Sequence, residues 1–229
     1  MGHWATASLR RVTASLLSIS MAAAAHAAGA LPEDFAKWTH SGTLGFDTTP
    51  MGAGVAAGVA DFPVLIRLDE TNFPFSQARP DGADLRFADQ DGSALPHEIE
   101  SWDAAGKTAA IWIKVPVVDG NSDKDFVRMY WGNDTASSRS DGKAVFNVES
   151  GFAAVWHLGN LQDATANGNH AQNRGTTATS AQIADGRAFD GQGGLAVPHA
   201  NSLNLNSTLT LAAWVNAETW EGHRCILQK

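Results

Sequence analysis

Short runs in which apolar and polar residues alternate constrain the fold of this chain more than any other feature. These runs cover 62–68, 83–87, 109–115, 127–131 and 209–215. Successive side chains of a β-strand point to opposite faces, so a two-residue period over a short run predicts a half-buried strand. No long stretch shows the 3.6-residue period of an amphipathic helix. The chain is therefore predicted to be all-β.

Asp-Gly and Asn-Gly pairs stand between these runs, at 81–82, 91–92, 119–120, 141–142, 167–168, 185–186 and 190–191. Glycine reaches positive φ without steric cost, so such pairs favour tight turns between antiparallel strands. A polar stretch rich in small residues, 134–147, is typical of a linker. We therefore predict a β-sandwich domain over 31–133 and a second β-rich block over 148–229.

The first residues are typical of an export signal. Arg10 and Arg11 precede an apolar stretch without acids, and Ala25-His26-Ala27 gives a small-x-small cleavage pattern. We predict a bacterial signal peptide over 1–28 and a periplasmic or secreted protein. A membrane anchor is the alternative, but the apolar stretch is short and rich in serine and alanine. No membrane span is expected after signal removal.

Charge and cysteine content exclude several classes of partner and scaffold. The chain has 16 Lys and Arg against 24 Asp and Glu, a formal net charge of −8, and no basic run. This balance argues against nucleic acid or an anionic membrane surface as the main partner. The single cysteine, Cys225, has no partner for an internal disulfide.

Two sets of motifs resemble known families. The segments Phe62–Leu68, Asp81–Phe87, Leu95–Trp102, Ala110–Pro116 and Met129–Asn133 occur in an order that resembles an exported bacterial domain family of unknown function. Members of that family stand ahead of laminin-G-like modules, and some are fused to MotA/TolQ/ExbB proton-channel segments. The resemblance covers nearly the whole of the first block.

The second set consists of Ala154–Leu158, Asp163–Asn169, Gly186–Gly191 and Leu209–Val215. It resembles the opening half of a laminin-G-like, concanavalin A-type jelly roll, so we expect 148–229 to be an incomplete jelly roll. The resemblance implies glycan or protein binding, often with a structural calcium ion, and some relatives are glycosidases.

Two tryptophans are candidate ligand-binding residues. Trp112 has the strand parity opposite to Ile111 and Ile113, and Trp214 has the parity opposite to Leu209 and Leu211. An indole on the polar face of a sheet can stack on a sugar ring. The alternative is that loops or another domain cover both indoles.

Asp163, Asn167 and Asn169 are the candidate metal ligands. Their side chains offer hard oxygen ligands, which suit calcium. The alternative is a side-chain-stabilised turn closed by Gly168, which needs no ion. Calcium is therefore the only cofactor considered for this chain.

The sequence predicts no catalytic residue. It contains neither a Gly-x-Ser-x-Gly nucleophile motif nor a glycine-rich phosphate loop. Glu98 and Glu100 could project from one face of a strand as the acid and nucleophile of a glycoside hydrolase. Exposed strand carboxylates are the simpler interpretation. We therefore do not expect an enzyme.

The predicted function is that of an exported envelope module that binds a glycan or an envelope protein. The alternative is the extracytoplasmic portion of a MotA/TolQ/ExbB-type biopolymer transport protein. In that case the full-length protein would have a membrane segment downstream of this chain.

Overall fold

The computed structural model describes residues 33–206, 208–218 and 225–228. The chain divides into two compact units, one of 31–205 and the other of 1–30 with 206–229. The predicted signal peptide, 1–28, lies outside the described residues. Within the part of the chain that the structure describes, no helix has the length and apolar character needed to cross a bilayer.

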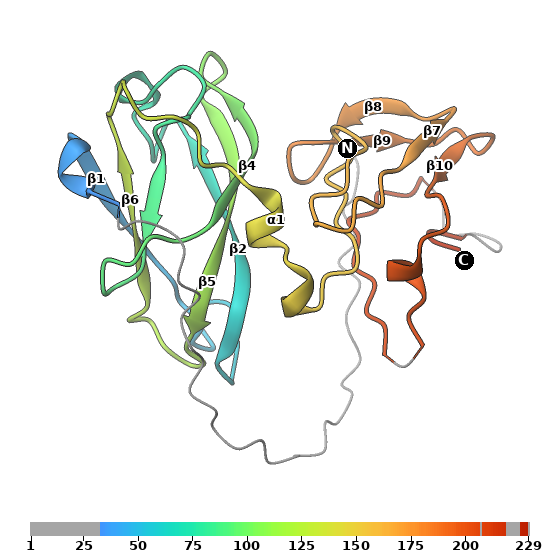
Figure 1. Cartoon of the computed structure of the whole chain (residues 1–229), viewed down its shortest axis with the longest axis horizontal. Coiled ribbons are helices and arrows are strands. Elements are labelled where there is room, and N and C mark those ends of the chain that lie inside the picture. The colour runs from blue at the N-terminus through green and yellow to red at the C-terminus, as the bar shows by residue number, and fades with distance from the viewer. Residues whose placement is uncertain (1–32, 207, 219–224, 229) are drawn as a thin grey trace. The chain divides into compact units, whose positions relative to one another are not determined.

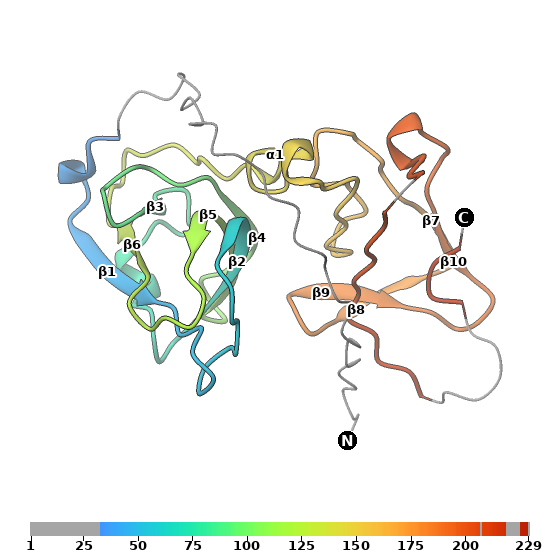
Figure 2. The ribbon, with the colours of Figure 1, turned by 90° about the horizontal axis from the view of Figure 1, so that it is seen from below.

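The larger unit contains two three-stranded antiparallel sheets (Figures 1 and 2). One sheet has the order β1-β6-β3, with strands His40–Gly45, Phe126–Trp131 and Arg86–Ala88. The other has the order β2-β5-β4, with strands Val59–Asp69, Thr108–Val118 and His97–Asp103. This arrangement confirms the predicted all-β sandwich.

The core lies between these sheets and draws side chains from both. Ile111 and Ile113 of β5 are fully buried, as are Phe87 of β3 and Val127 of β6. Trp112 has the opposite parity and lies on the outer face of its sheet, as the alternation of β5 predicts. The two-residue period therefore identified the core-facing side of the central strand.

The rest of the larger unit is built from short elements. After the helix α1 (Gly142–Val145) come two two-stranded sheets, β10-β7 and β8-β9. Their strands are β7 (Gln172–Arg174), β8 (Thr177–Ser180), β9 (Asp185–Ala188) and β10 (Gly194–Ala196). Single 3₁₀ turns occupy Phe35–Lys37, Phe75–Gln77, Val148–Ser150 and Asn201–Leu203. Among the described residues after Phe146, no side chain belongs to the apolar core.

The segment 134–147, predicted to be a linker, is packed against the sandwich. It contains α1, which contacts β4 and β5, and the side chains of Val145 and Phe146 are buried. The Asp141 carboxylate accepts a hydrogen bond from the Lys143 amide and caps the helix. The Asp141-Gly142 pair is thus a helix start rather than the predicted hairpin turn. The predicted boundary between two domains stays a prediction.

The strand predicted over 209–215 does not form in the structure. The described residues 208–218 have no strand pairing, and the side chains of Leu209, Leu211 and Trp214 are exposed. A strand needs a hydrogen-bonded neighbour, and none pairs with this segment among the described residues. Alternation alone therefore predicted the wrong local structure here.

Candidate functional site

Four polar and aromatic side chains meet on the outer face of the β2-β5-β4 sheet, and we call them the His157 cluster. Glu98 and Glu100 come from β4, Trp112 from β5, and His157 from the segment after α1. The His157 Nε2 atom lies 2.9 Å from Glu98 Oε2, and its Nδ1 atom lies 3.2 Å from Glu100 Oε2. The Trp112 indole N–H donates to Glu100 Oε2 over 2.6 Å.

Strand β4 contains a β-bulge at Glu100. Glu98 pairs with Trp112 and Ile99 with Ile111, but Ser101 then pairs with Ala110. Glu100 is therefore an extra residue in its strand, and such a bulge changes the direction of a side chain. Regular alternation predicted a shared face for the two glutamates, and both carboxylates contact His157 although Glu100 lies in the bulge.

The cluster is largely withdrawn from water. The exposed fraction is 5% for the Glu100 side chain, 16% for Glu98 and 14% for His157. The simpler interpretation of these glutamates, exposed strand carboxylates, is therefore wrong. Carboxylates in such a position need counter-charges or hydrogen-bond donors, because burial without them is costly.

The carboxylates set the charge of His157. Burial by itself lowers the pKa of this imidazole, but hydrogen bonds to Glu100 and Glu98, with their charges, outweigh burial and raise the pKa to about 9. Only the protonated ring can donate from both nitrogens. At neutral pH, His157 is thus an imidazolium that joins two carboxylates.

The segment carrying His157 is held from one side by the Asp163 carboxylate. Its Oδ1 atom accepts hydrogen bonds from the amides of Val155 and Thr165, at 3.0 and 2.9 Å. Its Oδ2 atom accepts from the Thr165 hydroxyl and the Asn169 amide, both at 2.8 Å. The side-chain amides of Asn167 and Asn169 both donate to the carbonyl of Ala153. These bonds fix the chain just before His157.

Arg187 of β9 holds the same segment from the other side. Its Nε donates to the Leu158 carbonyl over 3.0 Å and its Nη2 to the Gly159 carbonyl over 3.3 Å. Leu158 has a φ of 70°, an uncommon conformation for a residue other than glycine. The motifs of the second block thus serve to present His157 to the two glutamates.

Trp112, predicted to bind ligand, is half-buried within the His157 cluster. Its ring stacks on the His157 ring at a centroid distance of 6.1 Å and meets Phe146 edge-on at 5.4 Å. This geometry fits the alternative stated above, in which other parts of the chain cover the indole of Trp112. Trp214 lies in the smaller unit, and its side chain is 57% exposed. Ligand binding by either tryptophan stays a prediction.

The structure brings together the three predicted calcium ligands, Asp163, Asn167 and Asn169, around one turn. Both Asp163 oxygens already accept two hydrogen bonds each, so a bound ion would have to replace some of these donors. Within the described ranges no group of three or more His, Cys, Asp or Glu side chains is arranged to hold a metal ion. Calcium binding stays a prediction.

Sequence reasoning singled out both glutamates and Trp112 but missed His157. The imidazole lies 59 positions after Glu98 in the sequence. Its one local signal was its place inside the segment Ala154–Leu158, which the analysis used only as a family motif. The two carboxylates lie at opposite nitrogens of one ring, so the three groups do not converge on a single point.

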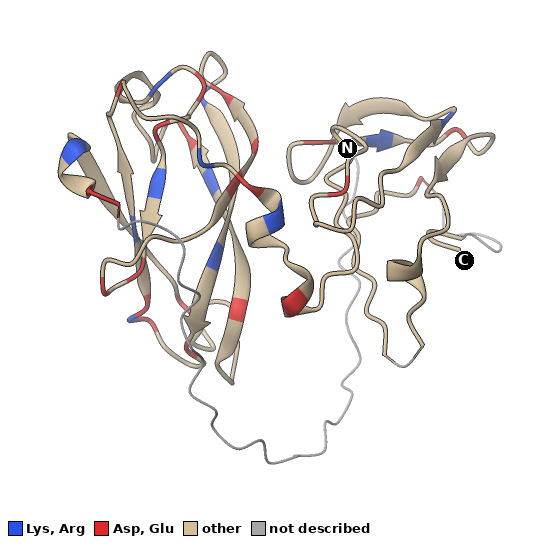
Figure 3. Ribbon diagram, viewed as in Figure 1, with Lys and Arg blue, Asp and Glu red and all other residues tan. Residues whose placement is uncertain are grey.

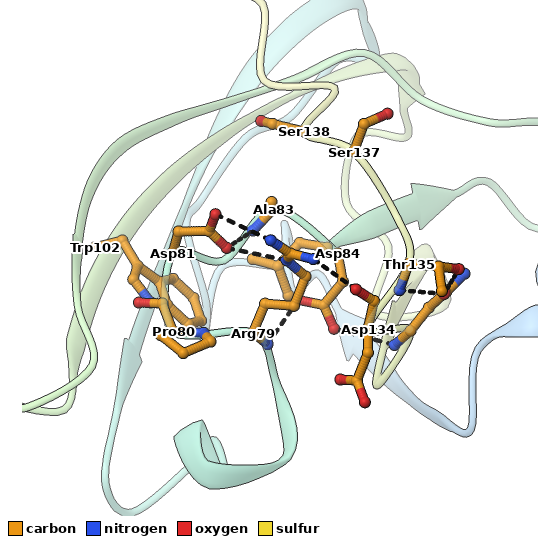
Figure 4. A network of polar contacts seen from close by, with 12 residues as sticks. Arg79, Pro80, Asp81, Ala83, Asp84, Trp102, Asp134, Thr135, Ser137 and Ser138 are labelled. Carbon is orange, nitrogen blue, oxygen red and sulfur yellow. Dashed lines mark hydrogen bonds and ion pairs between the residues drawn. The ribbon is translucent and has the colours of Figure 1, made fainter.

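A second polar network lies at the loops 79–84 and 132–135 (Figure 4). The Asp84 carboxylate accepts from the amides of Arg79, Gly132 and Asn133, and Arg79 donates to Asp81 and to the carbonyl of Asp134. These internal bonds join the two loops and leave no carboxylate oxygen of Asp84 without a donor. Elsewhere, acidic and basic residues intermingle up to residue 190, whereas the sequence carries no Lys, Arg, Asp or Glu from 191 to 217 (Figure 3).

Comparison with known proteins gives one match. Residues 81–158, about a third of the chain, match the model of a domain of unknown function (DUF2341). The matched range includes Glu98, Glu100, Trp112 and His157, so the whole His157 cluster lies within it. No curated protein and no solved structure matches this chain.

Proposed function

We propose that this chain is a non-enzymatic exported module of the cell envelope that binds a glycan or an envelope protein through its surface. The exposure of Trp214 carries the proposal. This residue is 57% exposed, and Leu209 and Leu211 on the same segment are each 58% exposed. We take these residues as the binding surface because a contiguous exposed apolar patch marks an interaction site, and an indole face suits the apolar face of a sugar ring.

The His157 cluster gives no support to the alternative of a glycoside hydrolase. A glycoside hydrolase needs one carboxyl group to protonate the leaving oxygen and a second to attack or to activate water. Here both carboxylates are engaged by His157, and Glu100 also accepts the Trp112 indole N–H. The cluster therefore has a structural use for both carboxylates and needs no substrate to explain them.

Glycan-array and envelope-extract binding assays test the proposal with wild type, Trp214→Ala and Phe189→Ala. The control residue, Phe189, is an equally exposed aromatic side chain on the larger unit. We expect Trp214→Ala to reduce binding by about tenfold or more, since aromatic anchors dominate such surfaces. The melting temperature should stay unchanged because the side chain is exposed.

Binding by Trp214→Ala that equals wild type, or an equal loss in Phe189→Ala, would contradict a ligand contact at Trp214. Membrane fractionation of the native protein tests the alternative implied by the resemblance to channel-fused proteins. A native species found in the membrane fraction, heavier than 24.1 kDa, would favour that alternative.

A further inference from the structure

A polar hollow of about 230 Å³ lies between the segment Glu33–Trp38 and the loop 133–139. Three cationic side chains line it, those of Lys37, Arg86 and Arg139, together with the acidic side chains of Glu33 and Asp34. The uncharged part of the lining is rich in hydroxyl and amide groups. It includes Asn133, Thr135 and Ser137.

The Glu33 carboxylate lines this hollow and is paired with two of its arginines. Glu33 Oε1 lies 3.4 Å from Arg86 Nε, and Glu33 Oε2 lies 3.2 Å from Arg139 Nη1. The Glu33 side chain is only 9% exposed. Nevertheless, neither Glu33 Oε2 nor Arg86 Nε makes a hydrogen bond within the described structure. The carboxylate is therefore held by charge without the directional bonds that make arginine–carboxylate pairs strong.

Arg86 is fixed in place without Glu33. Its Nη1 donates to the Leu85 carbonyl over 2.7 Å, and its Nη2 donates to the Ser137 carbonyl over 2.8 Å. The guanidinium also lies over the Trp38 ring, 5.1 Å from its centroid. This anchoring leaves Nε, a buried atom 3.4 Å from Glu33 Oε1, as the donor without a hydrogen bond. An arginine side chain that is already held in place loses little conformational entropy when it binds a carboxylate.

Glu33 can leave the hollow without unfolding the residues that follow it. Phe35 stacks on Tyr130 of β6 at a centroid distance of 4.3 Å, and the Trp38 indole N–H donates to the Asp84 carbonyl. These anchors come after Glu33 in the chain. Arg139 is half exposed, so its guanidinium can turn to an incoming group.

We propose that this hollow is a binding site for the carboxylate of an acidic sugar, in which Glu33 is the chain's own displaceable occupant. The two arginines recognise the carboxylate, and the hydroxyl and amide lining suits the hydroxyl groups of a sugar ring. The residues of this hollow differ from those of the proposed Trp214 surface, so its test stands apart from the binding assay above.

Isothermal titration with sodium D-glucuronate tests the site, with D-glucose as the uncharged probe. Glu33→Gln removes the internal competitor, whose effective concentration is high because it is tethered. We expect Glu33→Gln to bind glucuronate about tenfold or more tightly than wild type, and neither to bind glucose. Adding Arg139→Gln to that variant should abolish binding. Arg128→Gln, an exposed arginine outside the hollow, should not.

The wild-type chain provides a second measurement if Glu33→Gln fails to fold. Excess glucuronate should then shift the backbone amide signals of Ser137 and Arg139 in a ¹H–¹⁵N spectrum. Absence of both effects would overturn the site. Tighter binding of N-acetylglutamate than of glucuronate would overturn its assignment to a sugar.

Discussion

The charge of His157 predicts that the protein loses stability between about pH 6.5 and pH 9. The pKa of this imidazole rises from 6.5 to about 9 in the folded chain, because its bonds to Glu98 and Glu100 outweigh burial. One unit of pKa corresponds to about 1.4 kcal/mol, so the ionised contacts contribute about 3 kcal/mol to the free energy of unfolding. The side chain is only 14% exposed, so solvent screening reduces this figure little.

The direction of the effect follows from which state binds the proton more tightly. The folded chain does so, since its His157 pKa is the higher one. The stabilisation is therefore complete below about pH 6.5 and is lost as the pH rises through about 9. Above that range the neutral ring leaves two carboxylates without their counter-charge.

Urea unfolding at intervals from pH 6 to pH 9.5 measures this loss in wild type, His157→Gln and the control His199→Gln. His199 is exposed, so its replacement should leave the profile unchanged. At pH 6 we expect His157→Gln to be less stable than wild type by about 3 kcal/mol, with the gap closing toward pH 9.5. Parallel profiles for wild type and His157→Gln would refute the charged state assigned to this ring.

Three further outcomes follow from the structure. Burial lowers the pKa of His97 to about 4, so stability should fall as the pH drops from about 6.5 to 4, and His97→Gln should reduce that fall in acid-unfolding curves. Gly82→Ala places a Cβ 2.8 Å from the Trp102 ring at a φ of +67°, whereas the Cβ of the control Gly92→Ala, at a φ of +85°, meets open space. Urea unfolding should show that Gly82→Ala lowers the free energy of unfolding by about 1–3 kcal/mol more than Gly92→Ala does. Asp163→Asn should speed amide exchange over 153–169, and a calcium-dependent rise in melting temperature that this variant lacks would establish calcium binding there.

Strands were predictable where the core imposes their alternation. Ile111 and Ile113 face the core and Trp112 faces outward, which a local two-residue period encodes fully. The same rule failed at 209–215, because strand formation depends on a partner that the local pattern does not specify. Alternation thus predicts which side chains of a strand face the core better than it predicts whether the strand forms.

Turn positions were predictable in part, for a reason seen at the glycines. Gly82, Gly92, Gly168 and Gly191 have the positive φ that their Asp-Gly or Asn-Gly pairs predict. Gly142 instead starts a helix capped by Asp141, and Gly186 lies within β9. Aspartate caps helices as readily as it begins turns, so the pair alone does not distinguish the two.

The full set of residues in the His157 cluster could not be predicted from the sequence. The glutamates were recognisable as a pair, but their partner comes from a segment beyond α1, and its placement depends on the hydrogen bonds of Asp163 and Arg187. Local patterns specify the faces of a strand, whereas the element that covers the outer face is set by tertiary packing. The interpretation of these carboxylates as exposed failed for that reason.

The small sheets after Phe146 also depend on the sandwich, because the described residues after Phe146 have no apolar core of their own. Isolated two-stranded sheets are marginally stable in water, so β7-β10 and β8-β9 need support from the sandwich. The structure supplies it through His157 with the two glutamates, and through Arg67, whose guanidinium donates to the Gln182 carbonyl over 2.6 Å. Deprotonating His157 should therefore loosen the small sheets before it affects the sandwich, whose core lies elsewhere.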